Sequence, residues 1–495
     1  MPSPSVLRTR APSRPATLIA VGATALAIFA SGQRETRPPN VVVIVIDTLR
    51  ADHLRTYGYE KETAPFVSAL ARDSVVFSTA QSTSAWTAPA TASLFTSLYP
   101  FQHNVMTGFM VAQSMAEGDA IEFDRLPENV TTLPEMMKAA GYSTFGLTAN
   151  INIGELMGFA RGFDRFRNYT QDEPAEVLAK RAKLWRPRMA SAAPYFLYMH
   201  FMDPHAPYRE RSPWFEPPAD PARRRMMAYD SEIAYLDSVL RDLYVALGWD
   251  HHTILIVTAD HGEVFGDHNG RGHGTTLYSE MLNVPFLLRY PERFPARRIT
   301  EPVGLIDILP TLRDLTGAAP GPREEGRSFV PLIEGAPVHA EPRSLFAHLF
   351  RRDDGGRLLH SARRGRWKYI EGTSGERMLF DLSRDPHEST NLVEASQVVA
   401  EHLRTNLHDF VRTARRLPGR PTTTAPDAET IQQLRSLGYV QYGAVTARGR
   451  APSRRKLRRG SSANARRAGP KERAAALIRR RRRDTRRRAR SSGPG

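Results

Sequence analysis

Three stretches of this chain are apolar at almost every position and end abruptly at polar residues. They read NVVVIVI from residue 40, YFLYMHF from residue 195 and TILIVTA from residue 253. Short runs rich in β-branched and aromatic residues are typical of strands buried on both faces of a parallel sheet. Helical patterns lie between them, among them TTLPEMMKAAG and MMAYDSEIAYLDSVLRDLYVALG. Strands that alternate with helices predict a doubly wound α/β domain.

The pattern changes near residue 344, after the Pro- and Gly-rich stretch AAPGPREEGRS. Three short strand-like runs follow, SLFAHLF, RWKYIEG and RMLFDL, and then the helical stretch SQVVAEHLRTNLHDFVRTARR. This order predicts a small antiparallel α+β subdomain over residues 344–445, packed on the main domain of residues 40–343. Beyond it Arg, Ala, Ser and Gly dominate, which predicts a disordered basic tail over residues 446–495.

The first 32 residues have the layout of an export signal. Arg8, Arg10 and Arg14 precede an apolar run from Ala16 to Ala30, and small residues follow. A basic start, a short apolar centre and small residues at the end are typical of a secretory signal peptide. The alternative is an uncleaved membrane anchor, although a spanning helix needs ~20 apolar residues. Both predict an exported protein, either periplasmic or extracellular, or anchored in the membrane and facing outside.

The net charge of +17 comes from the tail alone. Residues 446–495 hold 20 Lys and Arg against 2 Asp and Glu, so the remaining chain has a net charge of −1. The arginine run RRRRRDTRRRAR has no aromatic residue, and it would bind nucleic acid or an anionic surface without specificity. We therefore expect no specific nucleic-acid partner. The absence of cysteine excludes disulfides, thiolate metal sites and a cysteine nucleophile.

Polar clusters follow the three predicted strands. Asp47 comes directly after the first, His205 lies in DPHAPY after the second, and Asp260 and His261 follow the third. Open α/β sheets bind ligands at the carboxyl ends of their strands, so we expect these side chains to lie at one edge. Adjacent Asp and His suit a divalent ion, because the carboxylate supplies charge and the imidazole supplies one nitrogen.

A Gly-rich loop, GEVFGDHNGRGHG, follows the third cluster and carries His268 and His273. Glycines at these positions would let the backbone approach a ligand closely. The alternative is a mobile surface loop.

Seven segments of the body resemble, in order, the sulfatase family of the alkaline phosphatase superfamily. They are VIDTLRADHLRTYGY, PATASLFTSLYP, TLPEMMKAAGYST, MDPHAPY, TADHGEVFGDHNGRGHGTTLYSEMLNVP, VGLIDILPTL and LFDLSRDPHESTNL. The resemblance runs from about residue 40 to residue 440. It implies an alkaline phosphatase/sulfatase-like sandwich, with a large central mixed sheet flanked by helices and a small C-terminal antiparallel α+β subdomain. It also implies a metal-dependent hydrolase of sulfate or phosphate esters.

The family places its nucleophile in a C/S-x-P-x-R segment, whose first residue is converted to formylglycine. The matching segment here is TAPAT, with Thr87 at the nucleophile position and Thr91 at the arginine position. Threonine is not converted to formylglycine, so the resemblance implies that the hydroxyl group of Thr87 attacks directly. The family geometry puts this residue at a helix N-terminus, where free N–H groups favour an anion. The alternative role for Thr87 is a plain helix cap.

Three further positions depart from the family pattern. Thr48 replaces the second of two tandem metal-binding aspartates, LTANIN from residue 147 replaces a lysine, and His273 replaces the lysine of a G-K-G element. With these departures, the resemblance implies a single divalent ion, whose ligands are Asp47, Thr87, Asp260 and His261. Hard oxygen ligands suit Ca, Mg or Mn, and the histidine favours Mn.

The remaining candidates are histidines. His205 and His273 are expected to transfer protons, one protonating the leaving group and the other activating water. His103, in YPFQHNV, and His268 are the candidates for substrate binding. Their alternative roles are to brace the helix, for His103, and to lie on the surface, for His268.

Three functions are compatible with these residues. The first is hydrolysis of a sulfated or phosphorylated carbohydrate or of a lipid-derived ester. The second is transfer of a phospho-headgroup between a lipid and a glycan, but such transferases carry several membrane-spanning helices and this chain has at most one. The third is a catalytically inactive carbohydrate-binding member. The retained residues Asp47, His205, Asp260, His261 and His273 argue against it. The hydrolase is the favoured interpretation.

Overall fold

The computed structural model describes residues 37–108, 123–169, 173–192, 194–336, 342–351, 356–414 and 422–424. The chain divides into two compact units, Met1–Val445 and Thr446–Gly495, and all described residues belong to the first. The export signal predicted for residues 1–32 and the tail predicted for residues 446–495 lie outside the described residues. In the part of the chain that is described, no helix combines the length and apolar character needed to cross a membrane.

A mixed eight-stranded sheet forms the centre of the fold. Its strands are β1 (Asn40–Ile46), β2 (Val75–Phe77), β5 (Ser143–Thr148), β6 (Arg165–Asn168), β7 (Tyr195–Phe201), β8 (Thr253–Ala259), β10 (Phe286–Arg289) and β11 (Arg297–Ile299). They lie in the order β11-β2-β10-β8-β1-β7-β5-β6. The strands from β8 to β6 are parallel, whereas β10 is antiparallel to both of its neighbours.

The three apolar runs that the sequence analysis predicted as buried parallel strands are β1, β7 and β8. They are neighbours in the middle of the sheet, and every residue of β7 and β8 is buried. β1 is buried from its second residue onward. Helices on both faces explain this pattern, because a central strand covered on both sides has no solvent-facing position for a polar residue. The predicted α/β sandwich is confirmed.

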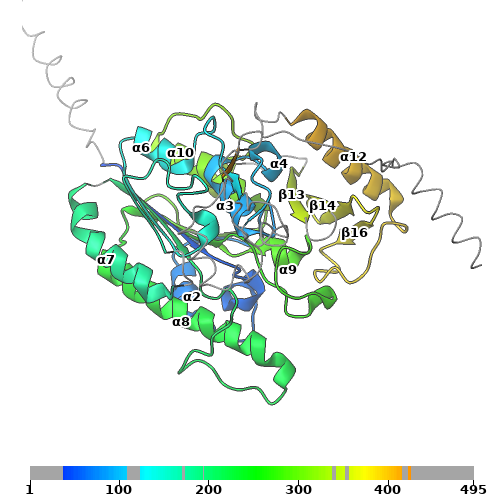
Figure 1. Cartoon of the computed structure of the whole chain (residues 1–495), viewed down its shortest axis with the longest axis horizontal. Coiled ribbons are helices and arrows are strands. Elements are labelled where there is room, and N and C mark those ends of the chain that lie inside the picture. The colour runs from blue at the N-terminus through cyan, green and yellow to red at the C-terminus, as the bar shows by residue number, and fades with distance from the viewer. Residues whose placement is uncertain are drawn as a thin grey trace, which may run out of the picture. The chain divides into compact units, whose positions relative to one another are not determined.

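Helices cover both faces of the sheet (Figure 1). They are α2 (Pro65–Ala71), α7 (Ala175–Ser191) and α8 (Arg224–Leu247) on one face, and α3 (Thr87–Thr96), α6 (Leu133–Ala139) and α10 (Ile308–Thr316) on the other. The two helical stretches predicted from the sequence are α6 and α8. α6 begins with a capping box between Thr132 and Glu135, and α8 ends at Gly248, whose φ of 66° is readily adopted by glycine.

Shorter elements complete the main domain. They are β3 (Ala80–Gln81), β4 (Phe123–Arg125), β9 (Asn283–Val284), β12 (Val303–Gly304), β17 (Thr422–Thr424), α4 (Pro100–His103), α9 (Ser279–Leu282) and α11 (Val330–Ile333). β12, β3 and β9 form a three-stranded sheet, and β17 pairs with β4.

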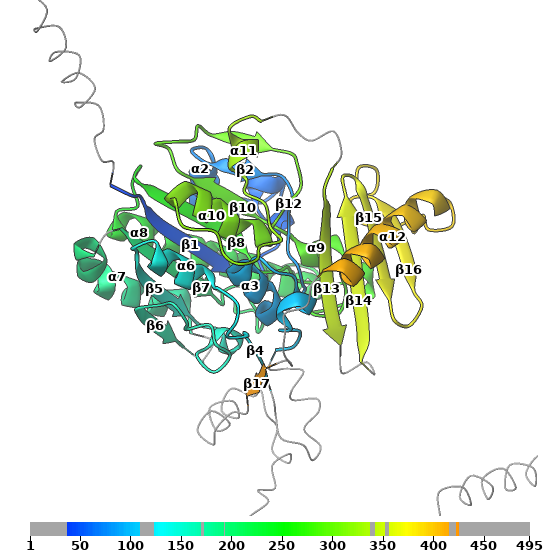
Figure 2. The same ribbon diagram turned by 90° about the horizontal axis from the view of Figure 1, so that it is seen from above.

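A four-stranded antiparallel sheet follows the main domain (Figure 2). It consists of β13 (Ser344–Arg351), β14 (Arg357–Arg364), β15 (Trp367–Gly372) and β16 (Arg377–Asp381) in sequence order, with α12 (Gln397–Thr413) after it. The sequence analysis predicted β13, β15, β16 and the helix. It missed β14, because RLLHSARR is rich in charged residues and has no β-branched residue.

Both faces of this sheet are covered. Phe346, Ala362 and Tyr369 pack beneath Leu403 and Leu407 of α12. On the opposite face the buried apolar residues are Ala347, Leu349, Leu359, Ile370 and Phe380, which pack with Val264, Leu277, Met281 and Leu282 of the main domain. The sheet therefore lies directly against the chain segment that follows β8.

Two histidines face each other on the α12 side of this sheet. His348 and His360 are cross-strand partners, and their Nδ1 atoms are 2.6 Å apart. Nitrogens this close share one proton, so one ring must donate and the other must accept. Burial lowers the pKa of His360 to about 4. Burial, together with the neighbouring His360 and His103, also lowers the pKa of His348 well below its usual range.

This pair predicts a loss of stability in mild acid. Because an unfolded histidine has a pKa near 6.5, the stabilisation is complete above about pH 6.5 and decreases as the pH falls towards 4. The free energy of unfolding is expected to fall by up to about 1.4 kcal/mol per pH unit for each histidine. Urea unfolding between pH 7.5 and 4.5 should show a shallower decrease for His360→Gln than for the wild type, with the exposed His251→Gln as the matched control. The same dependence of unfolding free energy on pH in His360→Gln and in the wild type would contradict this prediction.

Candidate active site

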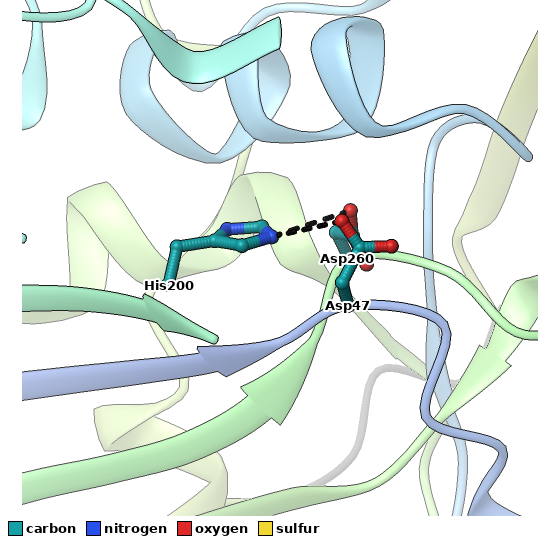
Figure 3. A group of neighbouring side chains, drawn as sticks. All are labelled: Asp47, His200 and Asp260. Atoms are coloured by element: carbon teal, nitrogen blue, oxygen red, sulfur yellow. Dashed lines mark hydrogen bonds and ion pairs between the residues drawn. The ribbon is translucent and has the colours of Figure 1, made fainter. Parts of the chain in front are cut away.

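Two carboxylates end neighbouring central strands. Asp47 follows β1, Asp260 follows β8, and the register pairs Ile46 with Ala259 immediately before them. Both side chains are completely buried, and Figure 3 shows their carboxylates side by side. Asp47 Oδ1 and Asp260 Oδ2 make no hydrogen bond with any residue that the structure describes. Two buried carboxylates with free oxygens need a compensating positive group, because the desolvation of an unpaired charge is costly.

Burial and the neighbouring charged groups shift the pKa values of the two carboxyl groups in opposite directions. Burial and the adjacent Asp47 raise the pKa of Asp260 well above its usual range. Burial would also raise the pKa of Asp47, but the hydrogen bond with His200 and the nearby His205 and His261 hold it below its usual range. Asp47 is therefore the carboxylate that stays charged without a cation.

His200 is a member of this site that the sequence analysis missed. It lies on β7, and its Nε2 is 3.2 Å from Asp47 Oδ2 and 3.8 Å from Asp260 Oδ2 (Figure 3). Its Nδ1 is 3.0 Å from the hydroxyl of Tyr198. A single polar residue inside an otherwise apolar strand was the available signal, since a buried central strand has no other reason to carry a histidine.

Thr87 is the first residue of α3, and its side chain points at the carboxylates. Thr87 Oγ1 is 3.3 Å from Asp47 Oδ2 and 3.3 Å from His261 Nε2. The residue before the helix is Trp86, so Thr87 itself is not the helix cap. Its hydroxyl lies at a helix N-terminus, where unpaired N–H groups and the helix dipole favour an anion.

His261 directs an unprotonated nitrogen, Nε2, toward the two carboxylates. Its Nδ1 is 2.9 Å from the carbonyl oxygen of Gly262, and because a carbonyl only accepts, Nδ1 must carry the proton. Nε2 then faces Asp260 Oδ2 at 3.6 Å and Asp47 Oδ1 at 3.8 Å. Burial, with the adjacent His273, lowers the pKa of His261 to about 4. A neutral imidazole with a free Nε2 is the form that binds metal ions.

These atoms fit a divalent cation. Asp47, His200 and Asp260 form a buried group whose ligand atoms all lie within 4.8 Å of one another. Thr87 and His261 extend it to five side chains. Ligand bonds of about 2.0–2.6 Å to a common ion are compatible with this spacing, and the two unpaired carboxylate oxygens are the donors that such an ion requires.

Two neutral residues donate hydrogen bonds to the carboxylates, one from its side chain and one from its backbone. Asn150, in the LTANIN stretch, donates from Nδ2 to Asp47 Oδ2 at 2.6 Å, and the sequence analysis did not single it out. Thr48 has a φ of 58°, and its backbone N–H donates to Asp260 Oδ1 at 3.2 Å. The oxygens that face these residues are thus held by hydrogen bonds without additional charge.

His273 and His205 lie beside the cluster. Their ring centroids are 5.0 Å apart, and the centroid of His273 is 4.8 Å from that of His261. His205 Nδ1 is 2.6 Å from the carbonyl oxygen of Ala206, and His273 Nδ1 is 3.4 Å from Glu263 Oε2. Both rings therefore have Nε2 available. Burial would lower the pKa of His273, but the buried carboxylate of Glu263 raises it above its usual value.

The two histidines expected to bind substrate lie apart from this cluster. His103 is the last residue of α4 and is fully buried against α3, where its Nε2 is 3.0 Å from Ser93 Oγ and its Nδ1 accepts from the N–H of Val105. Burial lowers the pKa of His103 to about 3. His268 stacks on Tyr278 at a centroid distance of 3.7 Å. Contact of either residue with a substrate stays a prediction.

The fold is of the alkaline phosphatase/sulfatase type. Residues 39–318 match the Sulfatase family, and residues 273–416 match the family of the N-sulphoglucosamine sulphohydrolase C-terminal region. The chain belongs to the sulfatase family.

Several known proteins are similar over most of their length. A Delta 4,5-hexuronate-2-O-sulfatase of Bacteroides thetaiotaomicron is 24% identical in an alignment that covers 82% of this chain and 99% of the relative. An ulvan-active sulfatase of Formosa agariphila is 25% identical over 73% of this chain and 78% of its own. The structure of a phosphonate monoester hydrolase of Agrobacterium radiobacter matches with a TM-score of 0.64 and 21% identity, covering 79% of this chain and all of that one.

Replacing His103 tests whether it braces α3 or contacts a substrate. His103→Leu should lower the free energy of unfolding by about 1–3 kcal/mol, because Ser93 and the N–H of Val105 lose their buried partner. The KM of the folded fraction should stay unchanged. Ser93→Ala is the matched control, since it removes one partner and leaves the ring in place. A raised KM with unchanged urea stability would instead identify His103 as a substrate contact.

Proposed function

We propose that the protein hydrolyses sulfate or phosphate esters with the Thr87 hydroxyl as a direct nucleophile. The supporting observation is the placement of Thr87 Oγ1 at the start of α3, 3.3 Å from both Asp47 and His261. A nucleophile at a helix N-terminus would receive the anionic group of the ester among the free N–H groups of the first turn. A threonine far from the carboxylates would have supported only a structural role.

We propose a divalent ion held by Asp47, Asp260, His261 and the Thr87 oxygen, with His200 as an additional nitrogen donor. Ca, Mg and Mn all accept carboxylate oxygens, and two imidazoles favour Mn over the other two. When bound, such an ion would lower the pKa of the Thr87 hydroxyl and supply the positive charge that the buried carboxylates lack.

In the first chemical step, Thr87 Oγ1 bonds to sulfur or phosphorus and the bond to the leaving oxygen breaks. The proton released by the Thr87 hydroxyl is taken up by the pair His205 and His273 and passed to the leaving oxygen, so that an alcohol departs. The product on the enzyme is a simple ester of Thr87.

The second step restores the hydroxyl. A formylglycine hydrate expels its sulfate by collapsing to an aldehyde, whereas Thr87 has a single oxygen on Cβ. Water must therefore attack sulfur or phosphorus, and the bond to Thr87 Oγ1 breaks. The second histidine accepts the proton of the water, and a proton returns to Thr87 Oγ1. Sulfate or phosphate is released.

The charge of the site favours a substrate with one negative charge. Thr91 and Asn150 bring no charge where the family pattern has cationic side chains, and His273 replaces a lysine. A monoanionic sulfate ester or phosphodiester is therefore expected to react faster than a phosphate dianion. The sulfatases named above suggest a sulfated carbohydrate as the natural substrate, which is consistent with the export predicted for this chain.

The variants Thr87→Ala and Thr87→Ser test the nucleophile. An aryl sulfate, a phosphate monoester, a phosphodiester and a phosphonate, each with Mn, Mg and Ca, would first identify the best substrate. On that substrate Thr87→Ala should lose at least ~10³-fold in kcat with its metal retained, and Thr87→Ser should keep partial activity. Thr96→Ala, on the same helix and bonded to Ala92, is the control. Wild-type turnover by Thr87→Ala would reject the mechanism.

The variant Asp260→Ala tests the metal site independently of turnover. It removes the free Oδ2 and the acceptor of the Thr48 and His261 N–H groups, so the purified variant should contain no bound divalent ion by elemental analysis. The wild type should contain about one ion per chain. The exposed Asp242→Ala serves as the control for removal of a carboxylate. Full occupancy in Asp260→Ala would show that the ligands are wrong.

A further inference from the structure

A buried ion pair lies within the C-terminal subdomain, where that subdomain contacts α9 of the main domain. Lys368 of β15 and Glu388, in the turn after β16, are 2.8 Å apart, with side chains 2% and 0% exposed. Glu388 has a φ of 52°, in the left-handed region that a residue with a side chain rarely adopts. A charge in this position is costly to bury unless it is paired, so removing either partner leaves the other uncompensated.

The pair holds the start of α9. The backbone N–H of Ser279 donates to Glu388 Oε2 at 2.5 Å, and Lys368 Nζ donates to Ser279 Oγ at 3.4 Å. His268 adds a second link, because its Nε2 is 3.2 Å from the carbonyl oxygen of Glu388 and its Nδ1 is 2.8 Å from Glu280 Oε1. Figure 2 shows α9 at the junction between the main domain and the C-terminal sheet.

α9 in turn contacts the residue next to the candidate metal ligand His261. The N–H of Gly262 donates to the carbonyl oxygen of Met281 at 2.8 Å. A Cβ at position 262 would lie 1.9 Å from the carbonyl oxygen of Glu280, so only glycine allows this approach. The carbonyl of Gly262 is also the acceptor that orients the His261 ring. A shift of α9 would therefore move the Gly262 carbonyl group, which sets the direction of the His261 ring and of its Nε2.

We infer that Glu388 is a positioning residue for the active site, and that the C-terminal sheet fixes the His261–Gly262 segment through Lys368, Glu388 and α9. His268 contributes to the same connection, because it contacts both Glu388 and Glu280. The role of Glu388 in catalysis rests on the proposed function of His261, whereas its effect on the backbone of residues 260–264 does not. Residues of RWKYIEG and LFDLSRDPHESTNL thereby acquire a role at the site, although none of them contacts its reacting atoms.

Hydrogen exchange measured by mass spectrometry on the full chain tests this inference. Glu388→Ala should raise exchange in peptides covering residues 277–284 and also residues 258–266, and should weaken Mn²⁺ binding measured by titration calorimetry at least several-fold. Glu388→Gln keeps an acceptor for the Ser279 N–H but leaves Lys368 without its ion-pair partner, so it should restore only part of the protection. Glu401→Ala, an exposed glutamate of α12, is the matched control.

Faster exchange in residues 277–284 with unchanged exchange in residues 258–266 would overturn the inference, because the pair would then stabilise only the junction. If Glu388→Ala does not fold, the double variant Glu388→Leu/Lys368→Met leaves no unpaired charge and should give the same pattern of exchange. A wild type that binds no Mn²⁺, Mg²⁺ or Ca²⁺ would refute the proposed metal site, and the exchange data would still decide the positioning role.

Discussion

Burial of two carboxylates at the ends of adjacent parallel strands is the constraint on which the site depends. Asp47 and Asp260 are brought together by the register of β1 and β8, and neither has access to solvent. Hydrogen bonds from Asn150 and from the N–H groups of Thr48 and His261 satisfy one oxygen of each. The oxygens that remain unpaired define where positive charge must reside. The proposed nucleophile, the candidate nitrogen ligands and the histidines that we propose for proton transfer are arranged around that position.

The sequence predicted the parts of the site that lie at strand ends or in recognisable segments. Asp47 and Asp260 directly follow apolar strands, and α/β sheets place ligands there, so their meeting was expected. His200 was missed because its position opposite Val45 depends on the register of β1 and β7, which local sequence does not encode. Asn150 was missed for the same reason, since β5 reaches Asp47 only across β7. The main fold was predictable because its central strands are uniformly apolar. The direction of β10 was not, because the residues of an antiparallel and a parallel buried strand look alike.

The candidate histidines divide into two groups by their hydrogen bonds. His205, His261 and His273 each have Nδ1 next to an acceptor, which leaves Nε2 for chemistry at the centre. His103 and His268 have both nitrogens engaged by protein groups, and they connect α3 and α9 to their surroundings. The sequence marked all five as candidates, four of them within the quoted family segments and His103 within YPFQHNV. What separates the two groups is Nε2, which protein groups engage in His103 and His268 and which faces the centre of the site in the three rings that we propose for catalysis and metal binding.

The central claim is that a threonine performs the covalent step without a formylglycine. Rapid acid quenching during the first turnovers of an excess of aryl ester, followed by peptide mapping, measures this directly. We predict that the peptide containing Thr87 carries a sulfuryl or phosphoryl group, and that this group disappears as substrate is exhausted. Release of aryl alcohol in a burst equal to the enzyme concentration, with Thr87 unmodified, would contradict it.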